Sequence, residues 1–218
     1  MKVIVAGAGR LGAQVAQVLA AARYEVTVIE QDEARAAELD QRLAVRLVVG
    51  DACDPDLLEY AGVLNTDLLV ATTGQDEDNL VVSLLAKGHF GVPRVVARVN
   101  DEDNTWLFGS GWGVDTAVPA ATPLISLIEE ATGAADTVAL LRLSKAGVNV
   151  IETAISAASR AAGRPLGEVP MPEGTVIATV VRDGRPTVPA ADMVLQPGDE
   201  LLVVSHAATE REVREAVQ

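Results

Sequence analysis

Three glycines near the start of the chain have the spacing of a phosphate-binding loop. The segment Gly7-Ala8-Gly9-Arg10-Leu11-Gly12 follows an apolar run at residues 3–6 and precedes a stretch with helical periodicity. In this context the first glycine permits a tight turn, the second lets phosphates approach the backbone, and the third lets helix and strand pack closely. The helix that follows presents N–H groups to an anion. The pattern therefore predicts a nucleotide site, with a purely structural turn as the alternative.

An acidic residue about 20 positions after such a loop binds the ribose hydroxyls in dinucleotide-binding folds. Glu30 lies at the end of the second predicted strand and satisfies this spacing. A carboxylate at this position would repel a 2′-phosphate. The sequence therefore favours NAD or an adenine nucleotide over NADP.

Other candidate residues follow later strands, because ligands of such sheets bind beyond the carboxyl ends of the strands. Asp51 could contact the adenine or its ribose, or it could begin a turn. Thr72 and Thr73 could meet phosphate or ribose, or form a polar turn. Arg10 could add a cation beside the phosphates or remain solvated. Arg98 could reach the site, although a surface ion pair is the simpler role.

Short apolar runs alternate with helical stretches over the first 133 residues. The expected strands are residues 3–6, 25–29, 46–49, 67–71, 93–99 and 114–117. The expected helices are residues 12–22, 33–43, a segment opened by Asp54-Pro55, 76–87, 102–108 and 122–131. Alternation of apolar strands with helices predicts a Rossmann-like, doubly wound parallel sheet covered on both faces.

The pattern changes after Gly133, which is expected to end the helix at 122–131 and to mark the domain boundary. The expected strands of residues 134–218 are 137–143, 148–155, 175–181 and 200–204, followed by a terminal helix at 210–217. Asp183-Gly184 is a strong signal for a two-residue hairpin. The sequence thus predicts two domains, residues 1–133 and a small, β-rich α+β domain of residues 134–218.

Charge and composition exclude several classes of protein. The 218 residues carry a formal net charge of −14, which argues against binding to duplex DNA, and only 3% are aromatic, which leaves few stacking surfaces for single strands. No apolar run approaches the length of a membrane-spanning helix, and no secretory signal is recognisable. The single cysteine, Cys53, excludes an internal disulfide and is expected to fill a small apolar role.

No catalytic or metal-binding motif accompanies the glycine loop. The two histidines, His89 and His206, lie in no motif with a carboxylate or a nucleophile. The acidic run Asp76-Glu77-Asp78 is typical of a helix start, where the helix dipole favours negative charge. A hydride-transferring enzyme needs a positioned acid or base, and none is recognisable here.

The chain resembles the cytoplasmic regulatory subunits of bacterial Trk/Ktr-type potassium uptake systems, the RCK (or KTN) family. The N-terminal half carries the similarity in residues 3–12, 28–30, 50–52, 71–79, 96–100, 113–115 and Pro119. The C-terminal half resembles the family's TrkA-C domain in residues 163–166, 172–174, 181–184, Pro189 and 197–201. The ordered pair of domains is the specific part of the resemblance, because many dehydrogenases share the glycine motif.

The resemblance implies a non-enzymatic switch that binds NAD(H) or ATP/ADP. It implies self-association into dimers and an octameric ring, which docks on the inner face of the plasma membrane under a potassium-translocating subunit. The helix at 122–131 would lie at a contact between subunits. Carried over by position, the ligand-binding residues would be Gly7, Ala8, Gly9, Arg10, Leu11, Gly12, Glu30, Asp51, Ala52, Thr72, Thr73 and Arg98.

Two features leave alternatives open. The glycine loop with Glu30 is also compatible with an NAD-dependent oxidoreductase, and the same two domains could regulate a cation/proton antiporter. Some ATP-responsive relatives have an acidic residue after the proline that precedes the helix between the domains, where it helps to hold a cation. Here Ala120 follows Pro119, so the resemblance carries over no metal ligand.

Overall fold

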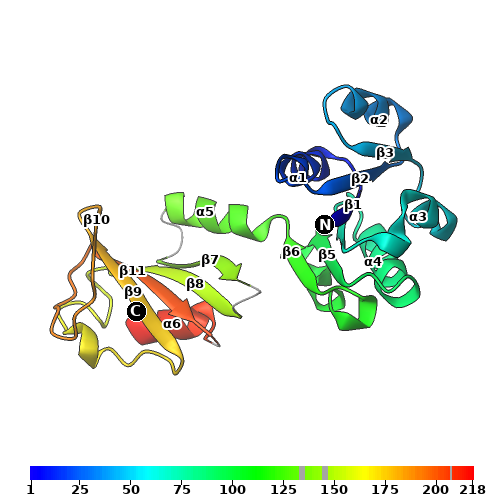
Figure 1. Cartoon of the computed structure of the whole chain (residues 1–218). Helices are drawn as coiled ribbons and strands as arrows, with labels where there is room; N and C mark the ends of the chain where they lie inside the picture. The colour runs from blue at the N-terminus through cyan, green and yellow to red at the C-terminus, as the bar shows by residue number, and fades with distance from the viewer. Residues whose placement is uncertain (133–135, 144–146, 207) are drawn as a thin grey trace. The chain divides into compact units, whose positions relative to one another are not determined.

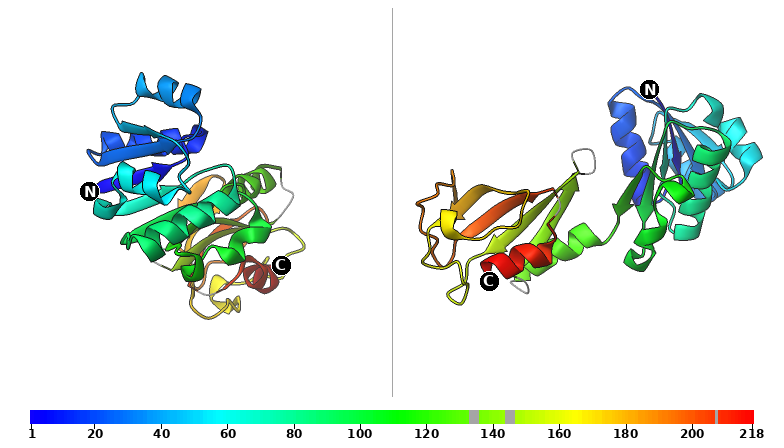
Figure 2. Two further views of the ribbon diagram at one scale, coloured as in Figure 1. Left: turned by 90° about the vertical axis from the view of Figure 1, so that its right-hand side faces the viewer. Right: turned by 90° about the horizontal axis from the view of Figure 1, so that it is seen from below.

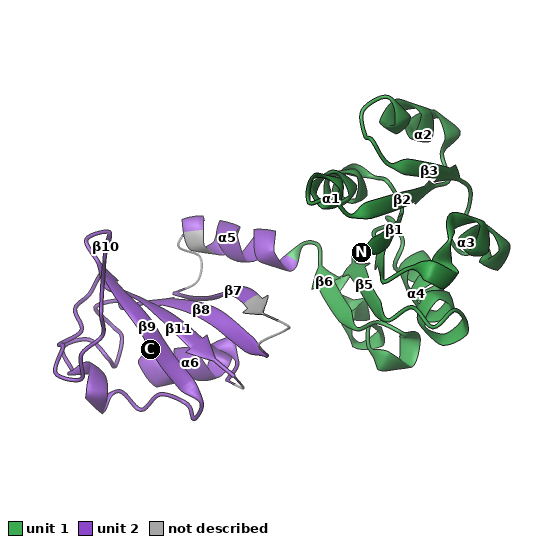
Figure 3. Cartoon of the chain, in the orientation of Figure 1, with its two compact units in different colours: residues 1–121 green, residues 122–218 purple. Residues whose placement is uncertain are grey.

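A computed structural model describes residues 1–132, 136–143, 147–206 and 208–218. The chain forms two compact units, residues 1–121 and 122–218 (Figure 3). This division precedes the boundary expected from the sequence, because the helix at 122–132 packs against a strand of the second unit. Gly133, the expected end of that helix, lies outside the described residues. The assignment of this helix to the first domain, residues 1–133, stays a prediction.

The first unit is built on six parallel strands in the order β3-β2-β1-β4-β5-β6 (Figure 1). Their bounds are β1 (Lys2–Ala6), β2 (Glu25–Glu30), β3 (Arg46–Val49), β4 (Leu68–Ala71), β5 (Arg94–Val99) and β6 (Thr116–Pro119). The strand order reverses between β1 and β4, and in open parallel sheets ligands bind at the carboxyl side of this reversal. The predicted doubly wound fold is therefore confirmed.

Helices cover both faces of this sheet (Figure 2). The helical segments are α1 (Arg10–Ala21), α2 (Glu33–Asp40), α3 (Pro55–Ala61), η1 (Val63–Asn65), α4 (Asp76–Leu84), η2 (Leu85–His89), η3 (Glu102–Leu107) and η4 (Ser110–Trp112). Alternate residues of β1 enter different cores: Val3 and Val5 pack on one face, and Ile4 and Ala6 on the other. This two-sided burial explains why the strands read as continuous apolar runs.

The bounds of several elements differ from the predicted ones, as three examples show. The expected helix at 76–87 is α-helical only to Leu84 and continues as one π-helical turn, in which the Phe90 N–H donates to the Leu85 carbonyl oxygen. The helix expected at 33–43 ends at Asp40. The strand expected at 114–117 begins only at Thr116, because the Asp115 carboxylate is held by the Val95 N–H and the Lys87 ammonium group.

The second unit is an antiparallel sheet in the order β10-β9-β11-β8-β7, as expected for a β-rich domain. Its elements are α5 (Thr122–Thr132), β7 (Thr137–Leu143), β8 (Val148–Ala154), η5 (Leu166–Glu168), β9 (Thr175–Arg182), β10 (Arg185–Thr187), β11 (Glu200–Ser205) and α6 (Glu210–Val217). Val213 and Val217 of α6 pack into the same core as Leu201 and Val203 of β11.

The predicted hairpin at Asp183-Gly184 is confirmed. Both residues have positive φ angles, 51° and 71°, as a type I′ turn requires. The turn joins β9 to β10, and Arg182 pairs with Arg185 in the register of the two strands.

A buried carboxylate fastens the turn that leads into β11. Asp199 is 1% exposed and accepts hydrogen bonds from Nε and Nη2 of Arg182, both at 2.7 Å, and from the Gln196 N–H at 2.8 Å. The Arg182 guanidinium, assisted by the Gln196 N–H, outweighs burial and lowers the pKa of the Asp199 carboxyl below its usual value. The pair thus joins the turn at 196–199 to the end of β9.

We expect Asp199→Ala to lower the free energy of unfolding of the second unit by about 1–3 kcal/mol at pH 7. Because the folded pKa of Asp199 is lowered, its contribution is present above the unfolded value of about 3.9 and is lost as the pH falls through the folded value. Urea unfolding followed by far-ultraviolet circular dichroism at neutral and acidic pH measures this difference.

Tryptophan fluorescence provides an internal control for that experiment. Trp106 and Trp112 both lie in the first unit, so their transition reports on that unit and should stay unchanged in Asp199→Ala. An unfolding free energy of the second unit that equals the wild-type value at pH 7 would contradict the assigned role of Asp199.

Candidate functional site

The glycine loop connects β1 to α1, and each of its three glycines meets a different constraint. Gly7 has a φ angle of +91°, and a Cβ there would lie 2.9 Å from the Thr73 backbone. A Cβ on Gly12 would overlap the Gly7 carbonyl oxygen and lie 2.7 Å from the Thr72 hydroxyl oxygen. Gly9 differs, since a Cβ there would meet nothing within 4 Å. Packing thus accounts for Gly7 and Gly12, whereas Gly9 leaves free space above the loop.

The Glu30 carboxylate fixes the glycine loop to the end of β2. The side chain is buried at 7% exposure, and its Oε2 accepts a hydrogen bond of 2.8 Å from the Ala8 N–H. Its Oε1 accepts from the Asp32 N–H at 3.0 Å, and Arg35 Nη1 lies 3.9 Å from Oε2. Each carboxylate oxygen can accept further hydrogen bonds, so these contacts leave room for ribose hydroxyls.

A cleft of about 340 Å³ lies at the carboxyl ends of the parallel strands. Eight of the twelve predicted site residues line it: Gly7, Gly9, Glu30, Asp51, Ala52, Thr72, Thr73 and Arg98. The other four, Ala8, Arg10, Leu11 and Gly12, do not. Ala8 contributes through its N–H to Glu30, and Gly12 through the packing of α1. The structure thus gathers in one place residues from the ends of five predicted strands.

Arg10 does not line the cleft. Its exposed side chain lines a separate hollow of about 230 Å³ together with Gln14, Gln17 and Arg42. The position of Arg10 beside the phosphates of a ligand therefore stays a prediction.

A buried amide organises the β4 side of the cleft. Asn79 is 0% exposed, and its Oδ1 accepts from the Thr73 N–H and the Thr73 hydroxyl, both at 2.9 Å. Its Nδ2 donates to the carbonyl oxygens of Thr73 and Arg98. The Thr72 hydroxyl donates to the Gly7 carbonyl oxygen at 2.9 Å. These bonds connect the turn after β4 to the glycine loop and to β5.

Asp76 anchors the loop that leaves β5. Its buried carboxylate accepts hydrogen bonds from the N–H groups of Asn100 and Asp101 and from the side-chain amides of Asn100 and Asn104. Burial acts to raise the pKa of Asp76, but these hydrogen bonds outweigh it and lower the pKa below its usual value. The residue predicted as a helix-start charge is therefore also a clamp for the loop at 100–104.

One carboxylate and one thiol in the cleft were not predicted as site residues. Asp78 and Cys53 both line it, and the Cys53 thiol lies 3.7 Å from the Asp78 carbonyl oxygen. Burial, with Asp51 and Asp78 nearby, raises the pKa of Cys53 to about 12, so the thiol stays protonated and unreactive. Burial also raises the pKa of Asp78, helped by Asp51 and Glu77.

Arg35 also lines the cleft and was not predicted as a site residue. It follows the Asp32 N-cap on α2, and only folding brings it to the cleft beside Glu30. No pattern in the sequence signals such a position, because Arg35 looks like any other charge on an exposed helix. Asp78 could have been recognised from its place in the helix that follows β4, at the same sheet edge.

Arg98 extends from β5 into the cleft. Its Nε is buried and has no hydrogen-bond partner, and no ion pair to it exists among the described residues. The surface ion pair considered from the sequence is thus not observed in the part of the chain that the structure describes.

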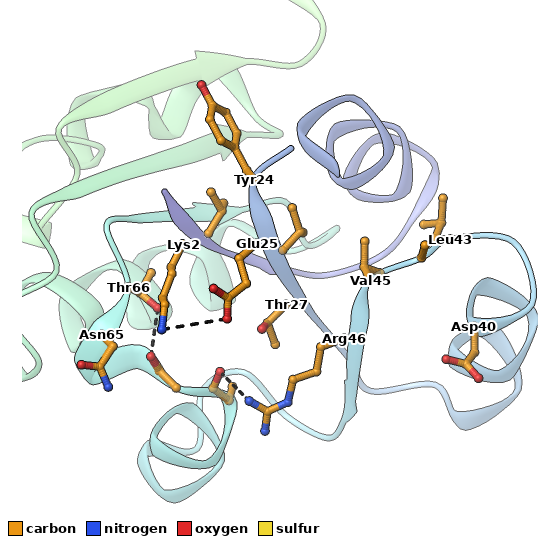
Figure 4. Close-up of a pocket in the computed structure, with 15 residues that line it drawn as sticks. Lys2, Tyr24, Glu25, Thr27, Asp40, Leu43, Val45, Arg46, Asn65 and Thr66 are labelled. Carbon is orange, nitrogen blue, oxygen red and sulfur yellow. Dashed lines mark hydrogen bonds and ion pairs between the residues drawn. The ribbon is translucent and has the colours of Figure 1, made fainter. Parts of the chain in front are cut away.

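A larger hollow of about 670 Å³ lies at the opposite, amino-terminal edge of β1, β2 and β3 (Figure 4). Its basic groups already have protein partners. Lys2 Nζ lies 3.9 Å from the Glu25 carboxylate, and Arg46 donates to the carbonyl oxygens of Tyr60 and Ala61 at the end of α3. Since ligands of such sheets bind at the carboxyl ends, the smaller cleft is the candidate site.

Among residues 1–132, 136–143, 147–206 and 208–218, no three His, Cys, Asp or Glu side chains are grouped so that they could hold a metal ion. Over the same ranges, no helix combines the length and the apolar character needed to span a bilayer.

Comparison with known proteins identifies the family of both halves of the chain. Residues 3–120 match the TrkA-N domain, and residues 150–218 match the TrkA-C domain. The Trk system potassium uptake protein TrkA of Mycobacterium tuberculosis is 42% identical over 218 residues, which cover 98% of this chain and 96% of that protein.

Solved structures support the fold. The GsuK channel bound to NAD aligns with a TM-score of 0.59 over 94% of this chain and 37% of that chain, at 18% identity. The Kef CTD of Shewanella denitrificans in its AMP-bound form aligns with a TM-score of 0.54 over 67% of this chain and 86% of that chain, at 25% identity. With both family domains matched in order and a relative of this identity along the full length, the chain belongs to the TrkA family of Trk potassium uptake proteins.

Proposed function

We propose that this protein is a nucleotide-binding regulatory subunit that gates a membrane potassium uptake system in response to NAD(H) or ATP/ADP. The observation that carries the proposal is the cleft that joins the open glycine loop to Glu30 at the carboxyl edge of the sheet. The names of the similar proteins support it, since one is a potassium uptake protein and others hold NAD or AMP.

The chemistry of the cleft favours binding over catalysis. No histidine lines it, and the thiol of Cys53 has its pKa raised to about 12. A general acid or base works best with a pKa near the working pH, and a nucleophilic thiol needs a lowered one. The side chains of the cleft suit recognition, and we propose that the protein is not an enzyme.

The proposed ligand lies across the strand ends. Its phosphates occupy the space above Gly9 at the N-terminus of α1, where backbone N–H groups and the helix dipole attract an anion. Its ribose hydroxyls donate to Glu30. The adenine reaches Asp51 and Ala52 after β3, while Thr72 and Thr73 flank the phosphates or a second ribose.

We propose self-association through α5 as the route from ligand to pore. Four large apolar side chains of α5 are exposed: Leu124 at 62%, Ile125 at 48%, Leu127 at 52% and Ile128 at 61%. A contiguous apolar surface of this kind is typical of an interface. Dimers would assemble into an octameric ring on the cytoplasmic face of the membrane, under a potassium-translocating subunit. A nucleotide with different affinities for two ring states would then shift the gate.

Titration calorimetry of the full chain with NAD, NADH, ATP and ADP tests the function. We expect stoichiometric binding of at least one of them, and no hydride transfer when the same sample is incubated with nicotinamide cofactor and candidate hydroxy acids. Reproducible turnover would instead establish an oxidoreductase. Binding of none of the four nucleotides would overturn the proposal.

Replacement of Glu30 should weaken nucleotide binding while the fold is retained. We expect Glu30→Gln, which keeps the shape of the side chain, to lower the binding free energy of an adenine nucleotide by about 1–3 kcal/mol. Glu33→Gln is the matched control, because Glu33 is exposed on α2 and does not line the cleft. Equal affinities of Glu30→Gln and the wild type in calorimetry would remove Glu30 from the ribose.

Two glycine variants separate binding from folding. Gly9→Ala should keep the melting temperature, because its Cβ meets open space, and should weaken nucleotide binding by occupying that space. Gly12→Ala should lower the melting temperature, because its Cβ overlaps the Gly7 carbonyl oxygen. Thermal melts and calorimetry of both variants check this; unchanged affinity in Gly9→Ala would mean that no ligand approaches the loop.

The exposed face of α5 should hold subunits together. We expect the wild type to be an oligomer at micromolar concentration in light scattering, and Ile125→Glu with Ile128→Glu to reduce its mass. Val188→Glu is the control, since Val188 is 83% exposed but lies on a loop of the same unit. A wild-type monomer at this concentration would count against the ring.

A further inference from the structure

The hollow at the amino-terminal edge of the first unit takes no part in the proposed nucleotide site. It has a volume of about 670 Å³, against about 340 Å³ for the cleft at the carboxyl edge, and the two share no lining residue. A nucleotide bound at the carboxyl edge therefore leaves this hollow free for another partner.

The lining of the hollow extends across several strands. It includes residues from the end of α2, from the starts of β3, β2 and β1, and from the segment before β4 (Figure 4). With neighbouring strands about 4.8 Å apart and the strand order β3-β2-β1-β4, the distance from β3 to β4 is roughly 14 Å. About four residues of extended chain span this distance. The lining therefore fits a segment of polypeptide better than a single small molecule.

The two basic side chains of the hollow are already held by groups of the protein. The Arg46 guanidinium donates to the Tyr60 carbonyl oxygen at 2.7 Å and to the Ala61 carbonyl oxygen at 3.5 Å. Its Cζ also lies 5.3 Å from the centroid of the Tyr60 ring. Lys2 Nζ has the Glu25 carboxylate at 3.9 Å. The hollow thus offers little attraction to an anionic partner.

The carboxylate of Asp40 is the charged group of the hollow that has no partner among the described residues. It is exposed and makes no hydrogen bond or ion pair there. Asp40 ends α2, where the helix dipole favours a cation. The exposed ring of Tyr24 lines the same hollow, and an aromatic face attracts cations as well. These groups suit a partner that carries Lys or Arg.

We propose that this hollow binds a Lys- or Arg-containing cytoplasmic segment of the membrane partner. Cytoplasmic loops of membrane proteins carry an excess of Lys and Arg. Residues 1–133 carry 9 basic and 20 acidic side chains, a net charge of −11, so the charges of the two surfaces are complementary. The inference rests on the proposed function and specifies the surface through which the subunit contacts the potassium-translocating protein.

Photo-crosslinking from inside the hollow identifies its occupant. In the full chain, expressed in the cells that produce it naturally, Ala44→benzoylphenylalanine places the label on an exposed residue of the hollow. Mass spectrometry then identifies the crosslinked peptide. We expect a Lys- or Arg-containing peptide from a cytoplasmic loop of the potassium-translocating protein. The same label at Val18, which is 68% exposed on α1 outside the hollow, is the control and should not reach that loop.

Other crosslinking results would overturn the proposal. A peptide from a second copy of this chain would assign the hollow to self-association. A peptide from a soluble protein would assign it to a different partner. Absence of any crosslink from Ala44→benzoylphenylalanine would show that no polypeptide occupies the hollow.

Reversal of one charge tests the electrostatic part of the proposal. Asp40→Lys should retain the fold, because a cation suits the C-terminus of α2. We expect about tenfold less potassium-translocating protein to co-purify with this variant from membranes, since like charges across an interface cost free energy. Its nucleotide affinity in calorimetry should equal that of the wild type, because Asp40 does not line the cleft. Glu102→Lys is the matched control, since Glu102 is exposed in the same unit outside the hollow.

The co-purification separates failure of this inference from failure of the proposed function. Equal amounts of translocating protein with Asp40→Lys and with the wild type would contradict the docking site, and so would an equal loss with Glu102→Lys. A wild-type sample that retains no potassium-translocating protein would overturn the proposed function, on which the docking site depends.

Discussion

The hydrogen bond from the Ala8 N–H to the buried Glu30 carboxylate is the contact on which the site depends. It joins the loop after β1 to the end of β2, so that the turn that can hold phosphates and the acid that can hold a ribose keep one fixed separation. The Thr72 hydroxyl secures the same loop from β4, and Asn79 extends the connection to β5. A ligand would therefore meet a rigid edge formed by four strands, and little free energy would be spent on ordering it.

The net charge of the first half of the chain determines which groups can attract an anionic ligand to this cleft. Residues 1–133 carry 9 basic and 20 acidic side chains, a net charge of −11, against −3 for residues 134–218. The field of the nucleotide-binding half thus opposes an anionic ligand at long range. Attraction has to be local, from the N–H groups of the glycine loop, the N-terminus of α1 and the unpaired Arg98. The carboxylates Asp51 and Asp78 add to the opposing charge and restrict where phosphates can lie.

The sequence predicted the strands, the parallel sheet and eight of the residues that line the cleft, because these follow from local patterns. Apolar runs, the glycine spacing and the capping signal Asp54-Pro55 each act over a few residues. Local patterns do not predict contacts between segments that are far apart in the chain. The positions of Arg35, Cys53 and Asp78 in the cleft depend on such contacts. For Arg10 the motif left two positions open, beside the phosphates or in solvent, and in the structure its exposed side chain lines another hollow. The π-helical turn at 85–89 likewise has no local signature.

All the proposals above require that the nucleotide binds at the carboxyl edge of the parallel sheet. The position of a bound nucleotide in a crystal of the full chain grown with ADP tests this most directly. We expect electron density along the cleft, with the ribose at Glu30 and phosphates above Gly9. Density at the amino-terminal hollow between Lys2 and Arg46, with the cleft empty, would contradict it.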